Sequence, residues 1–164
     1  MKLNALLLGM MLMAVAVAPA RADWRRPAWT QDKQLTVGFA VGHGFVDKSD
    51  SEIVALQGRV EFRRRQAYFA VRGSWVAQQC NTRPNPTELS LLGGISIPLD
   101  SDRNRINLGL GVGRTTAHGA SVTGLPCEFR IKFGVFGLTA FSNFNSRYSF
   151  HGICASLDFP IGIF

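Results

Sequence analysis

The stretch Val54–Arg63 reads VALQGRVEFR and alternates strictly between two kinds of residue. Successive side chains of a strand point to opposite faces, so a period of two predicts a β-strand with an apolar face and a polar face. The apolar or small set is Val54, Leu56, Gly58, Val60 and Phe62, and the opposite set is Ala55, Gln57, Arg59, Glu61 and Arg63. This two-faced pattern decides the fold class because it recurs along the chain.

About eight such segments follow one another from residue 34 onward. They cover roughly residues 35–42, 54–63, 67–76, 89–97, 106–113, 128–133, 138–145 and 153–163. The apolar faces are nearly free of charge, and the opposite faces are rich in Gly, Ser and Ala, as the narrow filled lumen of a small membrane barrel requires. We expect an all-β, eight-stranded antiparallel up-and-down transmembrane barrel over residues 34–164. Because periodicity alone does not say which face is inside, a soluble periplasmic barrel that binds an apolar ligand is the alternative.

The first 22 residues have the organisation of a bacterial secretory signal peptide. Lys2 gives a positive start, Ala5–Val17 is an uncharged apolar run, and Ala20 and Ala22 are small residues at a cleavage site. We expect cleavage after Ala22, followed by a periplasmic or interfacial segment over residues 23–33. Trp24 and Trp29 in that segment, with Trp75 further along, are expected to anchor the chain at a membrane interface. Bacterial outer membrane is the predicted location.

Charge and composition limit the partners. The chain carries 18 basic and 11 acidic residues, and removal of Lys2 and Arg21 with the signal peptide leaves a net charge of about +5. A basic surface can meet outer-membrane lipid, lipopolysaccharide or another anionic partner. We expect no nucleic-acid partner for an exported chain, and no cofactor or metal, because the cysteines and histidines lack the spacing of a metal site.

The segments between strands alternate in length, which predicts the two ends of the barrel. With a periplasmic N-terminus, longer outer loops fall around residues 46–52, 78–87 and 115–127, and a short one near 146–151. Short periplasmic turns fall at 63–66, 100–104 and 134–137. Cys80 and Cys127 then share the outer end, and we expect them to form a disulfide that leaves Cys154 as a spare thiol.

Charged residues recur in the phase that faces the lumen. Unpaired buried charge is costly, so opposite charges on neighbouring strands are expected to pair and to plug the barrel. The expected network contains Arg59, Glu61, Arg72, Glu128, Arg130, Lys132 and Asp158. An ion-selective pore is the alternative, but eight strands leave room only for side chains.

The strand pattern resembles the superfamily of small eight-stranded outer-membrane barrels. Segments that carry the resemblance are LTVGFAVGH (35–43), INLGLGVG (106–113) and the closing FPIGIF (159–164). The superfamily contains adhesion and serum-resistance barrels and lipid A-modifying barrels, and its members end on an aromatic residue that the outer-membrane assembly machinery recognises. Phe164 fits this only in part, because it is out of phase with the apolar face, and Pro160 removes a ladder donor from the closing strand.

The resemblance also implies an enzymatic alternative, a lipid A deacylase or acyltransferase. Deacylase barrels use a His-x-Ser-Asn pattern, whereas here Ser142-Asn143 is preceded by Ala140 at the histidine position. Without an adjacent base a serine is not activated. Weak catalytic candidates are therefore Ser142 or Ser149 with His151, and His43, which stands near Asp47, Ser49 and Asp50. We expect a non-enzymatic barrel that acts in surface interaction, adhesion to a host or extracellular ligand, or envelope integrity.

Overall fold

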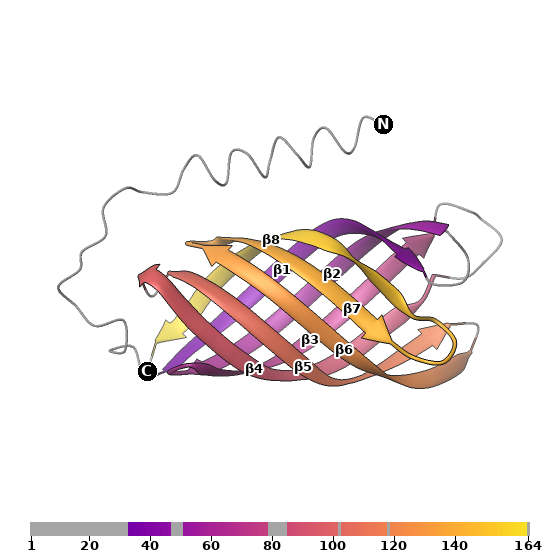
Figure 1. Cartoon of the computed structure of the whole chain (residues 1–164), viewed down its shortest axis with the longest axis horizontal. Coiled ribbons are helices and arrows are strands. Elements are labelled where there is room, and N and C mark those ends of the chain that lie inside the picture. The colour runs from indigo at the N-terminus through magenta and orange to yellow at the C-terminus, as the bar shows by residue number, and fades with distance from the viewer. Residues whose placement is uncertain (1–32, 47–50, 79–84, 102, 118, 164) are drawn as a thin grey trace, which may run out of the picture.

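The chain folds into a closed barrel of eight antiparallel strands. The computed structural model describes residues 33–46, 51–78, 85–101, 103–117 and 119–163. Its strands are β1 (Lys33–Val46), β2 (Ser51–Arg64), β3 (Ala67–Gln78), β4 (Thr87–Ser101), β5 (Asn104–Ala117), β6 (Ala120–Phe133), β7 (Phe136–Phe144) and β8 (Phe150–Ile163). Each strand pairs with the next in sequence, and β8 pairs with β1, so the sheet has no free edge (Figure 1). The predicted fold class is confirmed.

Strand alternation sorts the side chains between the lumen and the outer wall. Large apolar residues are exposed on the outside, among them Phe39, Phe69, Leu89, Leu110 and Ile161, each more than 60% exposed. Polar and charged residues of the opposite phase are buried inside. This is the reverse of a water-soluble barrel, whose apolar face must point inward, and it is the arrangement of a barrel whose solvent is lipid.

The prediction of a third outer loop over residues 115–127 is wrong, because most of this segment belongs to strands β5 and β6. β5 continues to Ala117, β6 begins at Ala120, and Thr115 pairs with Val122 in a regular ladder. Gly119 adopts a φ of 73°, which a tight turn at this place requires. The sequence here is polar on both faces, so it shows no apolar alternation although its β-branched residues favour a strand.

Pro160 is accommodated by an irregularity in the closing strand. Thr36 pairs with Pro160 and Leu35 with Gly162, so one extra residue of β8 is inserted between the two pairs. A bulge of this kind tolerates a residue that lacks an N–H, and it changes the phase of the alternation. The phase counted along the sequence is therefore not valid beyond Ile161. Phe164 itself lies outside the described residues.

The two ends of the barrel differ in their connections. Short turns at 65–66, 102–103 and 134–135 join strands at the end where β1 begins and β8 finishes. At the opposite end β1 and β2 are separated in the sequence by residues 47–50, β3 and β4 by 79–86, β5 and β6 by 118–119, and β7 and β8 by 145–149. The expected outer loops 46–52 and 78–87 fall largely outside the described residues. We refer to the end with the short turns as the turn end and to the other as the loop end.

Candidate functional site

Glu128 on β6 is the central acceptor of a charged cluster that fills the lumen. Arg59 on β2 places its Nη1 2.6 Å from both carboxylate oxygens of Glu128. The hydroxyl of Tyr68 donates to the same carboxylate at 2.9 Å, and Arg72 Nη1 lies 3.6 Å from it. Arg59 and Arg72 are direct cross-strand neighbours, a like-charge pair that is unfavourable without a counter-charge. Glu128 supplies that counter-charge from the other side of the barrel.

A second branch runs through Glu61 and Arg130. Arg59 donates to Glu61 through Nε at 3.1 Å and Nη2 at 2.7 Å. Glu61 also accepts from Arg130 on β6, and Arg130 Nη1 lies 3.3 Å from Asp158 on β8. All four side chains are less than 10% exposed, so each charge depends on its partner rather than on water.

The structure brings the seven residues of the expected lumen network into one interior. Six of them are joined by the ion pairs above. Lys132 follows Arg130 on the inner face of β6 and is buried in the same lumen. The interior therefore has the composition of a plug rather than of an open channel.

Sequence reasoning missed Glu88. This residue at the start of β4 accepts from Arg72 Nη2 at 2.9 Å and from Ser90, and its side chain is fully buried. Glu88 falls between the expected loop 78–87 and the expected strand 89–97, so it is not counted among the predicted lumen charges. Its phase, shared with Ser90 and Leu92, is the signal that could have found it.

Glycines on the inner face make room for the cluster. A Cβ at Gly109 would lie 2.1 Å from the Tyr68 hydroxyl and 3.1 Å from Glu128 Cγ. A Cβ at Gly137 would lie 2.4 Å from Ser156 Oγ and 3.0 Å from Asp158 Oδ2. The Gly-rich polar face of the sequence is thus explained by crowding in the lumen and not by turns.

An apolar layer lies in the lumen toward the loop end. Its members are Val46, Ile53, Ala55, Val76, Phe141, Phe150 and Cys154, all less than 10% exposed. Phe141 and Phe150 meet edge to face at 6.1 Å. Cys154, expected to be a spare thiol, is packed into this layer. The layer is formed by β1, β2, β3, β7 and β8, whereas the buried polar residues Glu88 and Thr115 line β4 and β5 near the same end.

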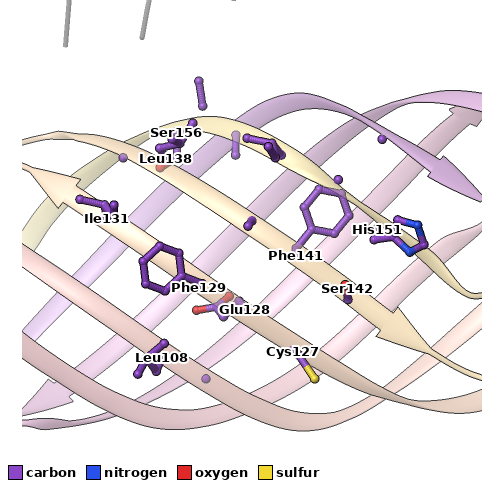
Figure 2. A pocket seen from close by; sticks show the side chains of 18 of the residues that line it. Leu108, Cys127, Glu128, Phe129, Ile131, Leu138, Phe141, Ser142, His151 and Ser156 are labelled. Carbon is purple, nitrogen blue, oxygen red and sulfur yellow. The ribbon is translucent and has the colours of Figure 1, made fainter. Parts of the chain in front are cut away.

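The catalytic candidates lie outside the lumen. Ser142 on β7 and His151 on β8 are direct ladder partners on the outer wall, and Cys127 on β6 is the other neighbour of Ser142. Figure 2 shows these three side chains at one end of a cavity of about 1710 Å³ whose lining is mostly apolar. The β7–β8 register thus brings Ser142 beside His151, the histidine considered as its partner, although the His-x-Ser-Asn pattern itself has Ala140 at the histidine position.

The other two candidates are separate. Ser149 accepts from the backbone N–H of Asn145 at 2.9 Å and donates to the carbonyl of the same residue at 2.6 Å, so it closes a turn. His43 lies 3.5 Å from Glu52 and edge-on to Phe45 at 5.7 Å. Asp47, Ser49 and Asp50, which were considered with His43, lie outside the described residues.

Cys127 lies in strand β6 and not in a loop, and it forms no disulfide with another cysteine of the described residues. Its expected partner Cys80 lies outside the described residues, so the disulfide stays a prediction. Trp75 is on the outer wall of β3 and is 43% exposed, as an interface residue would be. Trp24, Trp29 and the signal-peptide residues lie outside the described part.

Two further kinds of feature are absent from the part of the chain that the structure describes. No three His, Cys, Asp or Glu side chains there are grouped so that they could hold a metal ion. No helix there is both long and apolar enough to span a membrane.

The chain thus has the fold of a closed eight-stranded antiparallel β-barrel, with an apolar outer wall and an ion-paired interior. The solved structure of Neisserial surface protein A (NspA) has this fold: it superimposes with a TM-score of 0.52 at 13% sequence identity, over 77% of this chain and 96% of NspA. No family model matches the chain, and no curated protein matches it in sequence.

Proposed function

We propose that this protein is an integral barrel of the bacterial outer membrane that acts in surface interaction or envelope integrity and does not conduct solutes. The observation that carries the proposal is the distribution of side chains, with an apolar outer wall and a charged interior. An apolar wall of this extent is stable only in lipid. A signal peptide over residues 1–22, with export to the periplasm, fits the same destination.

The interior supports a closed barrel. The ion pairs from Glu88 to Asp158 fill the middle of the lumen, and the apolar layer around Phe141 and Phe150 fills the region toward the loop end. Ions would have to pass the paired charges of Arg59, Glu128 and Arg72 in the lumen. The stripes of Leu, Ile and Phe lie outside, which is the opposite of what a soluble barrel with an apolar ligand inside requires.

The test combines fractionation with reconstitution. The protein should be found in the outer-membrane fraction, and its unboiled band should migrate differently from the boiled band on a denaturing gel. In planar bilayers the folded protein should give no steady single-channel steps. A soluble protein without a band shift would refute the membrane assignment, and regular conductance steps would refute the closed interior.

A lipid-modifying hydrolase on the same barrel is the second candidate. The specific observation in its favour is that Ser142 and His151 are cross-strand partners on the outer wall, where side-chain Cβ atoms are about 4.5–5.5 Å apart. There the Ser142 hydroxyl would attack the carbonyl of an acyl ester while His151 accepts its proton. The ester C–O bond then breaks, and His151 returns the proton to the departing sugar hydroxyl, which leaves an acyl-enzyme. Water would hydrolyse the acyl-enzyme, releasing the fatty acid and restoring the Ser142 hydroxyl.

Mass spectra of lipid A from cells with and without the protein separate the two candidates. Loss of one acyl chain with the native protein, but not with Ser142→Ala, would establish the hydrolase. Identical lipid A spectra in all strains would exclude the hydrolase and favour the non-enzymatic barrel.

A further inference from the structure

The turn end of the barrel carries a compact group of exposed basic residues, Lys33, Arg64 and Arg65, which we call the basic corner. Lys33 and Arg64 are direct partners in the β1–β2 ladder, and Arg65 follows in the turn to β3. Like charges placed directly opposite each other in a ladder are unfavourable. Lys33 and Arg64 form no ion pair with any acidic residue of the described part of the chain.

The basic corner stands at the border of the apolar wall. One position further into the wall on the same face, Phe62 pairs with Leu35 and with Phe69. Phe62 is 42% and Phe69 67% exposed, so this aromatic row fits the girdle that marks a membrane interface. Side chains of Lys and Arg just beyond such a girdle reach the level of the lipid headgroups.

The geometry of the corner is fixed by the backbone. Arg65 adopts a φ of 55°, which gives the β2–β3 turn a defined shape, and the carbonyl of Gln66 accepts a hydrogen bond from Ser96 N at 2.6 Å. The basic side chains therefore project from a turn that is tied to β4.

Other parts of the barrel rim have mixed charge. The adjacent β4–β5 hairpin carries Arg103 together with Asp100 and Asp102 in the sequence. At the loop end the exposed charges of the described residues include Glu52 as well as Arg114 and Arg147. Among the described residues, the exposed charges of the β1–β3 corner are all positive; Asp32 precedes Lys33 in the sequence.

We propose that the basic corner is a binding site for the phosphodiester headgroup of an anionic phospholipid in the periplasmic leaflet. This inference rests on the proposed function, which puts the turn end at that leaflet. An anionic headgroup would relieve the repulsion between Lys33 and Arg64, and arginine adds paired donors that match phosphate oxygens. Basic side chains near an anionic surface contribute about fivefold each to binding, so three would contribute roughly a hundredfold at low salt.

The test uses the folded full chain in bilayers of equal parts phosphatidylglycerol and phosphatidylethanolamine, with the lipids that stay bound counted by native mass spectrometry. We expect retained phosphatidylglycerol in the native protein and a loss of at least tenfold in a triple variant, Lys33→Gln, Arg64→Gln and Arg65→Asn. The matched control, Arg114→Gln with Arg147→Gln, removes positive charge at the loop end and should retain the lipid.

Two results would overturn the inference. One is equal retention of both lipids by the native protein, a readout that does not depend on any variant. The other is loss of phosphatidylglycerol in the loop-end control but not in the triple variant. The heat-dependent band shift is recorded in parallel: its absence in the native protein speaks against the membrane barrel, whereas a shift without lipid preference speaks against the basic corner alone.

Discussion

Arg59 and Glu128 are 69 positions apart in sequence, and Arg59 Nη1 lies 2.6 Å from each carboxylate oxygen of Glu128 across the lumen. The contact joins β2 to β6, two strands that are not neighbours in the barrel wall. It therefore ties opposite sides of the barrel together, and it keeps the adjacent Arg59 and Arg72 from facing each other without a counter-charge.

Replacing Glu128 with Gln should strongly destabilise the barrel. The substitution preserves shape but removes the carboxylate shared by Arg59 and Arg72, so these two buried guanidinium groups keep only Glu61 and Glu88 as carboxylate partners. Removal of one partner from a buried ion pair costs about 3–5 kcal/mol. Urea unfolding of the protein in lipid vesicles measures the loss, with the exposed Glu52→Gln as control. Equal stability of the two variants would contradict the central role of Glu128.

Arg72 and Glu88 should be strongly coupled. Each single change to Met leaves a buried charge, whereas the double change removes both and fills the space with apolar atoms. We expect the double variant to be more stable than the sum of the single effects allows, by about 1–3 kcal/mol. A double-mutant cycle measures this coupling, and additive effects would mean that the two charges do not depend on each other.

Inner and outer glycines should respond differently to an added methyl group. Gly109→Ala would push on the Tyr68 hydroxyl and disturb its bond to Glu128, at a cost of about 1–3 kcal/mol. Gly58→Ala is the matched control, because a Cβ there has nothing within 4 Å. Folding yield and unfolding midpoint report the difference. A larger effect at Gly58 would show that the two faces are assigned the wrong way round.

A charged residue in the middle of the apolar outer wall should lower the free energy of unfolding. Leu110→Lys puts a cation on the outer face of β5 near the middle of the strand, where the expected cost is about 2–4 kcal/mol. Thr123→Lys, at the loop end of β6, should cost about 1 kcal/mol or less. Insertion into vesicles and unfolding in lipid measure both. Equal tolerance at the two positions would argue against a membrane-embedded wall.

The sequence predicts the part of the fold that depends on period two. In segments such as Val54–Arg63 the alternation alone shows which side chains share a face. If the charged face is buried, its acidic and basic side chains are then expected to form ion pairs. The alternation does not predict which strands face each other across the lumen. The Arg59–Glu128 contact therefore becomes apparent only in the structure of the closed barrel. Glu88 was not predicted as part of the lumen network because it falls between the expected loop 78–87 and the expected strand 89–97.

Other differences have equally local causes. The hairpin around Gly119 is polar on both faces and shows no alternation to read. The bulge beside Pro160 changes the phase, which cannot be counted from the sequence. Ser142 and His151 are nine positions apart and become neighbours only through the β7–β8 register.

Fluorescence quenching tests directly whether the apolar face of the barrel contacts lipid while the charged face does not. Trp24, Trp29 and Trp75 are replaced by Phe, and a single Trp is introduced either by Phe39→Trp on the outer wall or by Phe141→Trp in the lumen. In vesicles of lipids brominated along their acyl chains, we expect strong quenching of the Phe39→Trp variant and weak quenching of the Phe141→Trp variant. Strong quenching of the Phe141→Trp variant, with none for Phe39→Trp, would contradict this assignment of the two faces.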